Sequence, residues 1–305
     1  MATKDVDMVL VMGLSGAGKS HFINTLTGAR SGDDNCAEVG KRLKSHCPGF
    51  DDTERSDTEI LKEITQTLST LYILGLKLKG VIYLQRITDV RMQGSSMKNL
   101  QLFVRMVGKE QLENVVFVTT MWDKLKEKDL KEAIERDNEL RDEYWGEFLS
   151  LGATATRFEG SQASAEGILS ILLGKKDTQL KVLNQLVNDR KALRQTDVGA
   201  FLEPRVKQQE ADYSDRIEEL EQQLKLERNS SRKLNAQRWK RQAEEGKKQR
   251  KQDRETLDSK PGVDAKKTLE NLREGSLHIW KNALQALAAV VSISVAITGI
   301  ILSNS

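Results

Sequence analysis

The sequence predicts an α/β domain with a parallel sheet and flanking helices, followed by a long charged helical segment and an apolar helix at the C-terminus. Three observations support this prediction. Short apolar runs alternate with helical patterns up to about residue 175, which is typical of a parallel sheet covered on both faces. Polar helical sequence follows, and Ala283–Leu302 then contains twenty residues without a charge.

The composition indicates the cellular compartment of the chain and the boundaries of its segments. The 305 residues include 30% charged residues and two cysteines, too few for a disulfide framework, so the chain suits a reducing compartment. The first apolar run is too short for a signal peptide. We expect a domain at 1–175, a helical extension at 176–204, a charged coiled coil and basic helix at 205–258, a linker at 259–276 and an apolar helix at 277–305.

The elements of the first domain follow from the spacing of apolar residues. Short apolar runs between polar or turn residues predict three strands, at Val6–Met12, Val81–Leu84 and Val115–Val118. Apolar residues at three- and four-residue spacing predict the helices, at 19–26, 56–74, 100–107, 130–148 and 163–173. Three strand–helix pairs are fewer than this fold class normally has.

A glycine-rich motif directly follows the first strand and opens the first helix. It consists of Gly13, Leu14, Ser15, Gly16, Ala17, Gly18, Lys19 and Ser20 and fits the complete phosphate-binding loop pattern in its required context. The backbone N–H groups of such a loop surround phosphates, and the helix N-terminus adds a partial positive charge. We expect Lys19 to reach the β- and γ-phosphates and the Ser20 hydroxyl to bind Mg²⁺.

A second motif, Thr119–Asp123, ends the third strand at the edge of the sheet where ligands bind in open α/β folds. GTPases carry an N/T-K-x-D element there, and Thr120 and Asp123 occupy its first and last positions. An aspartate can accept hydrogen bonds from guanine N1–H and N2–H₂, a pair of donors that adenine lacks. Asp is also an ordinary loop residue, so this short pattern leaves guanine recognition and a plain loop as alternatives.

Four stretches together resemble a family of fungal G-domain-containing P-loop proteins, related to immunity-associated (AIG-type) GTPases, septins and chloroplast Toc receptors. They are GLSGAGKSHFINTLTG, PGFDDTERSDTEIL, LKGVIYLQRITDVRMQGSSMKNL and VVFVTTMWD, and the resemblance covers about residues 6–175. It implies a P-loop GTPase fold that binds GTP or GDP with Mg²⁺. It also implies Gly49 as the switch glycine, Asp123 as the contact to the base, and the backbone of Ser164 and Ala165 as a further contact to the base.

The switch region departs from the family pattern. His46 and Cys47 occupy the Asp and Thr positions of the DTPG element, and imidazole is a poor ligand for Mg²⁺. Only 26 residues lie between Ser20 and Cys47, whereas a switch and two strands need about 35–45. We therefore infer an internal deletion that removes the strand expected beside Val6–Met12; a naturally divergent loop is the alternative. Phe50 follows Gly49 and cannot orient a water, so hydrolysis would be slow or partner-dependent.

The charged segment offers two further surfaces. Tyr213, Ile217, Leu220 and Leu224 keep 4-3-4 spacing, which indicates a short coiled coil over 213–224 that could mediate self-association. Residues 232–254 contain ten Lys/Arg and three acids, so this tract could meet anionic lipid or nucleic acid, or be a solvated helix. Trp239 is its only aromatic residue, which gives no indication of a nucleic-acid stacking platform.

The apolar segment 283–302 predicts a tail anchor with the rest of the chain on the cytoplasmic face of a membrane. Twenty helical residues are about 30 Å long, the thickness of the hydrocarbon core. The alternatives are a helix lying on the membrane or docked on the G domain. The leading function is a membrane-held guanine-nucleotide-binding protein that assembles with itself or a partner. The alternative is a non-enzymatic scaffold with a vestigial G domain; Asp123 disfavours a third candidate, an ATPase or kinase.

Overall fold

The computed structural model describes residues 6–28, 55–90, 92, 94–274 and 298–303. Five strands form one sheet in the order β4-β3-β2-β1-β5, in which the first four are parallel and β5 is antiparallel to β1. The strands are β1 (Val6–Gly13), β2 (Lys77–Arg86), β3 (Val115–Thr120), β4 (Thr154–Arg157) and β5 (Thr298–Ser303).

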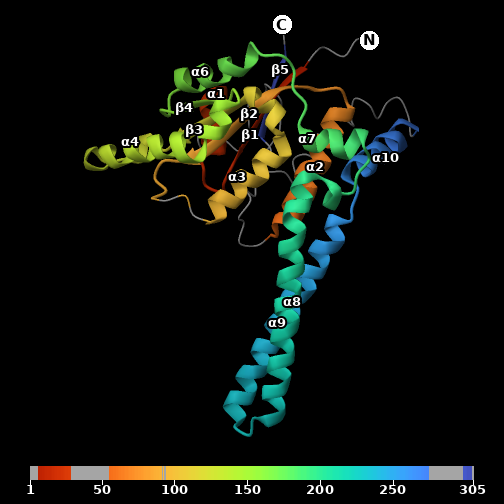
Figure 1. Ribbon diagram of the computed structural model, residues 1–305. Coiled ribbons are helices and arrows are strands. Elements are labelled where there is room, and N and C mark those ends of the chain that lie inside the picture. The colour runs from red at the N-terminus through yellow and green to blue at the C-terminus, as the bar shows by residue number, and fades with distance from the viewer. Residues whose placement is uncertain (1–5, 29–54, 91, 93, 275–297, 304–305) are drawn as a thin grey trace.

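Helices cover both faces of the sheet, and two long helices project from it as a stalk (Figure 1). Helices α1 and α6 lie on one face, while α2 and α3 lie on the other. The helices are α1 (Lys19–Thr27), α2 (Asp57–Ile73), α3 (Gly94–Val107), α4 (Leu130–Glu139), α5 (Gly146–Ser150), α6 (Gln162–Leu173), α7 (Lys181–Leu183), α8 (Asp197–Leu226), α9 (Ser230–Leu257) and α10 (Pro261–Glu274). Two π-helical turns occur at Leu140–Tyr144 and Asn184–Asn188, and four 3-10 helices at Lys109–Asn114, Trp122–Lys124, Glu127–Asp129 and Leu193–Gln195.

Strand β1 supplies side chains to both faces of the sheet, as expected when successive residues of a strand point in opposite directions. Met8 and Leu10 belong to the hydrophobic cluster beneath α2 and α3. Val9 and Val11 belong to the second cluster, beneath α1 and α6. All four side chains are buried, which accounts for the continuous apolar run in this part of the sequence.

The three predicted strands and the predicted helices of the first domain are confirmed as elements. The capping box at Ser56 and Glu59 is also present at the start of α2. The helix expected over 130–148 is divided into α4, a π-helical turn and α5. Strand β4 was not predicted, because its sequence is short and polar and all four residues are only half-buried. Its pairing with β3 determines its structure.

The extension and the linker differ from expectation. Residues 176–204 were expected to be helical throughout, but α8 begins only at Asp197, and Thr178 instead forms an isolated β-bridge with Leu78. The linker expected at 259–276 contains α10, which packs against α2. Pro261 and Gly262 suit a linker, but proline is favourable at the first position of a helix, and Pro261 is the first residue of α10. Ala265 and Leu269 then bury one face of α10.

The charged segment folds back on itself as a helical hairpin, not as a single coiled-coil strand. Helices α8 and α9 lie side by side along the stalk (Figure 1). Leu220, from the predicted seam, is buried in the hairpin. A β-carbon added at Gly246 would lie 2.4 Å from the Tyr213 ring, so a second seam residue also faces α9 closely. The seam therefore packs within this chain, and self-association through it stays a prediction.

The prediction of a C-terminal apolar helix is wrong for its last residues. Thr298–Ser303 forms strand β5, with Ile300 opposite Val9 of β1, whereas residues 283–297 lie outside the described residues. Thr298, Ile300 and Ile301 are β-branched and suit a strand, and β1 offers an edge for backbone pairing. In the part of the chain that the structure describes, no helix is both long and apolar enough to span a membrane.

Strand β5 also bears on the predicted loss of the switch strand beside β1. The inferred deletion removes the strand expected beside Val6–Met12, which predicts that one edge of β1 has no partner. Residues 29–54, which include His46, Cys47 and Gly49, lie outside the described residues, so the deletion itself stays a prediction. The edge of β1 opposite β2 is paired by β5, so the predicted unpaired edge is wrong.

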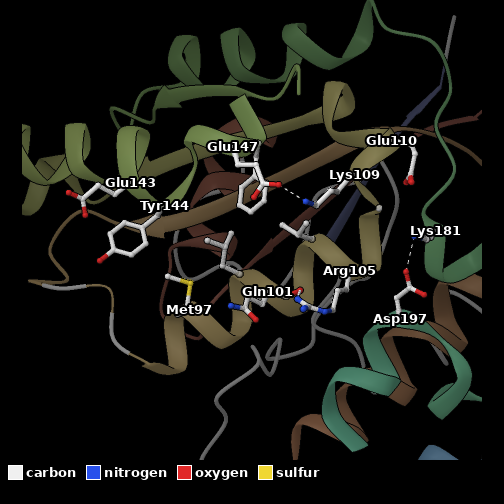
Figure 2. Close-up of a pocket in the computed structure, with 14 residues that line it drawn as sticks. Met97, Gln101, Arg105, Lys109, Glu110, Glu143, Tyr144, Glu147, Lys181 and Asp197 are labelled. Carbon is white, nitrogen blue, oxygen red and sulfur yellow. Dashed lines mark hydrogen bonds and ion pairs between the residues drawn. The ribbon is translucent and has the colours of Figure 1, made fainter. Parts of the chain in front are cut away.

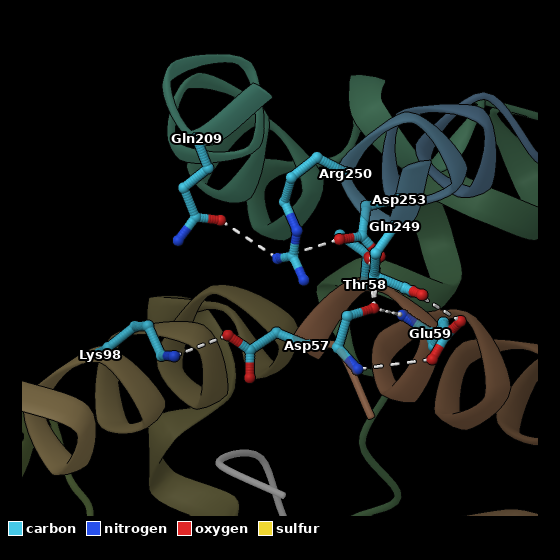
Figure 3. A network of polar contacts seen from close by, with 9 residues as sticks. Asp57, Thr58, Glu59, Lys98, Gln209, Gln249, Arg250 and Asp253 are labelled. Carbon is cyan, nitrogen blue, oxygen red and sulfur yellow. Dashed lines mark hydrogen bonds and ion pairs between the residues drawn. The ribbon is translucent and has the colours of Figure 1, made fainter. Parts of the chain in front are cut away.

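A buried carboxylate joins the stalk to the first domain (Figure 3). Asp253 of α9 is fully buried. Its Oδ1 accepts hydrogen bonds from the hydroxyls of Ser56 and Thr58 at the start of α2, the latter at 2.6 Å. The Arg250 nitrogen Nη1 lies 3.1 Å from Oδ2 and also donates to Gln209 of α8 at 3.1 Å. A negative charge at a helix N-terminus is favourable, so this contact holds the stalk against α2.

Two neighbouring contacts reinforce this junction (Figure 3). Gln249 of α9 donates a hydrogen bond of 3.2 Å to Glu59. Lys98 of α3 pairs with Asp57 at 2.6 Å. The first turn of α2 is therefore fixed by side chains from two other helices.

We expect Asp253→Ala to lower the free energy of unfolding by about 1–3 kcal/mol, because it leaves the hydroxyls of Ser56 and Thr58 without their acceptor. Chemical denaturation of the full chain measures this. The matched control is Asp258→Ala, which removes a half-exposed ion pair with Arg194 and should cost less than about 1 kcal/mol. Equal effects of the two substitutions would contradict the structural role of Asp253.

Removing residues 298–305 should destabilise the sheet, because the edge of β1 would lose its backbone partners. We expect the melting temperature to fall by at least about 2–4 °C, which corresponds to 1 kcal/mol for a domain of this size. Removing only residues 304–305 leaves β5 intact and serves as the control. The pairing of β5 with β1 is wrong if both truncated chains melt at the same temperature.

Candidate functional site

The loops that follow the four parallel strands meet at one edge of the sheet. Because β1 to β4 are parallel neighbours, their carboxyl ends lie together, and ligands bind at such edges in open α/β folds. The predicted phosphate-binding loop follows β1, Thr120 is the last residue of β3, and Asp123 follows that strand. The sequence-predicted residues that the structure describes therefore lie on one side of the molecule, apart from the stalk.

The loop Gly13–Ser20 needs glycine for two physical reasons. A β-carbon at Gly13 would lie 2.4 Å from the Leu84 carbonyl oxygen, so only glycine allows β1 and β2 to approach this closely. Gly18, which precedes α1, has φ 86° and ψ 17°, a left-handed conformation that glycine adopts without steric cost. The loop consequently turns sharply from strand into helix.

Lys19 lies across the loop and is buried. Its Nζ donates hydrogen bonds to the carbonyl oxygens of Gly13 at 2.9 Å and Leu14 at 2.8 Å. The ammonium group is therefore held above the loop by the backbone that surrounds it. A positive charge in this position can reach phosphate oxygens bound in the same loop.

Thr120 connects the two predicted motifs. Its Oγ1 donates a hydrogen bond of 2.9 Å to the Ala17 carbonyl oxygen in the loop. A β-carbon on Gly18 would lie 3.8 Å from Oγ1 of Thr120. Thr120 is buried, so its hydroxyl fixes the conformation of the loop from the end of β3, two strands away from β1 in the sheet.

The N-terminus of α1 suits an anion. Its cap is Gly18, which makes no side-chain capping bond, and its first turn contains no acidic residue. A capping side chain or a carboxylate would compete with phosphate for the free N–H groups. Ser20 in this turn is exposed. These residues fit a bound phosphate, with the Ser20 hydroxyl available as one Mg²⁺ ligand among phosphate and water oxygens.

The loop after β3 places Asp123 at the surface, with 43% of its side chain exposed, and Lys124 pairs with it at 3.2 Å. Met121, which takes the lysine position of the predicted element, is left-handed with φ 65°. Such a backbone is uncommon outside glycine and is concentrated at functional sites. Trp122 anchors the loop, because its Nε1 donates to Thr119 at 3.1 Å and the Arg157 guanidinium lies 4.3 Å from its ring.

A buried carboxylate supports this loop from below. Asp137 of α4 accepts a hydrogen bond of 2.9 Å from Thr119 and pairs with Arg157 at 2.9 Å and Arg141 at 3.0 Å. The strand ends β3 and β4 are thereby fixed to one another. The loop that carries the exposed carboxylate of Asp123 is therefore held by fixed side chains, as expected of a loop that positions a binding residue.

Ser164 and Ala165 occupy the first turn of α6 and do not present free backbone donors. The N–H of Ser164 donates to Ser161 Oγ at 3.2 Å, and that of Ala165 donates to the Ser161 carbonyl at 3.1 Å. The Ser164 hydroxyl accepts from the Glu159 N–H at 3.1 Å. Both N–H groups are therefore used within the helix, and the contact to the base that the resemblance implied stays a prediction.

Arg86 is a site residue that sequence reasoning missed. A β-carbon at Gly16 would lie 3.1 Å from its Nη1, so the guanidinium borders the phosphate-binding loop. Asp89 orients it through an ion pair of 3.0 Å with Nε. The position of Arg86 at the end of β2, at the same edge of the sheet as the phosphate-binding loop, could have identified it.

Other predicted features of the site are not placed by the structure. Gly49 lies outside the described residues. Within the described ranges, no group of three or more His, Cys, Asp and Glu side chains could hold a metal ion.

A separate cavity of about 560 Å³ lies between α3, α5 and the start of α8 (Figure 2). Lys109 pairs with Glu147 on its rim, and Lys181 pairs with Asp197 at 2.8 Å. The hydrogen bond between these last two holds the pKa of Lys181 above and that of Asp197 below its ordinary value. None of the sequence-predicted site residues lines this cavity, and its ion pairs tie the helices together.

Comparison with known proteins found no matching family model and no matching curated protein. Among solved structures, the chain is similar to Toc33 from Arabidopsis thaliana in complex with Mg²⁺ and GMPPNP, at 18% identity, and to Toc33 in complex with GDP and Mg²⁺, at 17% identity. Each match covers 57% of this chain and 88% of the Toc33 chain, with a TM-score of 0.37. A likeness of this extent carries no argument about function.

Thr120→Val should loosen the loop, because the isosteric valine cannot donate to the Ala17 carbonyl. We expect a loss of about 1 kcal/mol in the free energy of unfolding and faster amide hydrogen exchange in residues 13–20. Thr120→Ser retains the hydroxyl and is the matched control. A valine variant that behaves like the serine variant would show that this hydrogen bond does not fix the loop.

Proposed function

We propose that this chain is a guanine-nucleotide-binding protein that assembles with itself or a partner according to the bound nucleotide. One observation carries the proposal: Lys19 lies across a complete phosphate-binding loop, at 2.9 Å and 2.8 Å from two of its carbonyl oxygens. The loop ends at the N-terminus of α1, where neither a capping side chain nor an acid competes with phosphate.

Each residue of the proposed site has a distinct role. The N–H groups of Gly13–Ser20 would bind phosphate oxygens, and Lys19 would neutralise their charge. The Ser20 hydroxyl would be a ligand of Mg²⁺. Arg86, oriented by Asp89, would add a second positive charge beside Gly16.

The specificity for guanine rests on Asp123. Its exposed carboxylate, held on the loop anchored by Trp122, would accept both guanine donors. The turn between β4 and α6 lies beside this loop, because β4 pairs with β3. It leads to Ser164 and Ala165, whose backbone stays the proposed second contact to the base.

The proposed dependence of assembly on nucleotide rests on α2. The switch-like residues 48–53 immediately precede the described start of this region, and Ser56 and Thr58 bind Asp253 of α9. A change of the switch residues with the bound nucleotide would therefore act on the stalk through the first turn of α2. Hydrolysis is proposed to be slow or partner-dependent, because Phe50 follows Gly49.

Titration of the full chain with labelled GDP and ATP tests the nucleotide proposal. We expect GDP to bind more tightly than ATP, and Lys19→Ala to abolish binding because the phosphates lose their counter-charge. Asp123→Ala should weaken GDP by about 1–3 kcal/mol, because two guanine donors are left unpaired. Glu127→Ala, on the neighbouring surface, is the control for Asp123 and should have no effect.

A change of specificity makes the test sharper. Xanthine presents a carbonyl where guanine presents its amino group, and an Asn side chain offers one acceptor and one donor. We therefore expect Asp123→Asn to favour xanthosine diphosphate over GDP. Equal binding of GDP and ATP, or GDP binding that survives Lys19→Ala, contradicts the proposal and favours the scaffold with a vestigial G domain.

A further inference from the structure

The end of the helical hairpin exposes large apolar side chains that nothing in the described chain covers. We call residues 220–241, around the turn between α8 and α9, the hairpin tip. Leu226, Leu234 and Trp239 there are 82%, 52% and 54% exposed. Figure 1 shows this turn at the end of the stalk that is remote from the sheet. The tip is therefore free to meet a partner without involvement of the nucleotide site.

A groove runs between the ends of the two helices. It has a volume of about 450 Å³, and Leu226 and Trp239 line it together with the buried Leu220. Arg232, Asn235 and other polar side chains complete its lining. Two large apolar side chains beside a cation form an amphipathic surface at this end of the molecule.

The tip is strongly basic. The tip, residues 220–241, contains seven Lys/Arg and two acids, Glu221 and Glu227, so its formal charge is 7 − 2 = +5. Among the described residues, Lys240 is the one member of this set with an ion pair, at 2.7 Å from Glu221. The other six basic residues are exposed. The exposed apolar side chains are thus surrounded by cations that are available to anionic groups.

Three kinds of partner can be compared on these grounds. A second copy of the tip would bring two surfaces of charge +5 together, which is unfavourable. Single-stranded nucleic acid would gain from several stacking aromatics, whereas Leu226 and Leu234 offer none. An anionic bilayer matches all the features, because its headgroups attract Lys and Arg, Trp favours the interface, and Leu enters the acyl boundary.

We propose that the hairpin tip binds the surface of anionic lipid bilayers, with Leu226 and Trp239 entering the interface and the surrounding Lys and Arg side chains contacting the headgroups. This surface is distinct from the apolar segment 283–302. The proposal does not rest on nucleotide binding, since the tip lies at the opposite end of the stalk from the phosphate-binding loop.

Sedimentation of the full chain with vesicles tests the proposal. Vesicles of phosphatidylcholine with phosphatidylserine should bind the chain, and vesicles of phosphatidylcholine alone should bind it at least tenfold more weakly. The apolar variant Leu226→Ser with Trp239→Ser should lose at least about tenfold in affinity. The charge variant Arg232→Glu with Lys233→Glu should lose at least about fivefold in affinity for these vesicles for each of its two substitutions. All four side chains are exposed, and circular dichroism verifies that the helices are retained.

Matched controls separate the tip from the rest of the molecule. Val90→Ser and Lys131→Glu change one exposed apolar and one exposed basic residue far from the tip and should bind vesicles as the unaltered chain does. Lys19→Ala should also retain vesicle binding, which separates this test from that of nucleotide binding. A blue shift of tryptophan fluorescence on vesicles should disappear in Trp239→Phe and persist in Trp122→Phe.

Three results would overturn the proposal. The first is equal binding to vesicles with and without phosphatidylserine. The second is vesicle binding that both tip variants retain, which would assign the contact to another part of the chain. The third is displacement of the vesicles by single-stranded RNA that binds the tip, which would make this surface a nucleic-acid site.

Discussion

The structure depends on the burial of residues 8–12 of β1. This strand contributes side chains to both hydrophobic clusters, pairs along both edges, and ends in the loop that carries Lys19. Because a buried strand must satisfy all its backbone groups, its second edge needs a partner. Strand β5 is that partner in this chain, where the family pattern would place a parallel strand from the switch region. The phosphate-binding loop therefore stands on a strand whose position is fixed from both sides.

The second constraint is the buried carboxylate of Asp253. A charged group without exposure is stable only when it is paired and hydrogen-bonded, and here the partners come from α2 and α9. The contact makes the stalk and the sheet domain one unit at the first turn of α2. That turn directly follows the switch-like residues, so the same interaction that stabilises the fold connects the proposed nucleotide site with the stalk.

The sequence was sufficient where local periodicity decides structure, as in β1, α2 and α6, and where glycine spacing is imposed by sterics, as at Gly13. It was insufficient where tertiary pairing decides. Strand β4 is too polar to be recognised without β3, and Thr298–Ser303 belongs to an uncharged run that would equally suit a helix. The α8–α9 turn contains no glycine or proline to mark it. Arg86 becomes a candidate site residue only through the order of the strands.

The central claim is that nucleotide in the loop after β1 acts on the stalk through α2. Hydrogen exchange of the full chain, measured without nucleotide, with GDP and with a non-hydrolysable GTP analogue, tests it most directly. We predict slower exchange at residues 13–20 with either nucleotide, and a difference between the two in the first turn of α2 and in α9 around Asp253. Unchanged exchange at residues 13–20 at saturating nucleotide would contradict binding, and identical exchange in α2 and α9 would contradict the coupling.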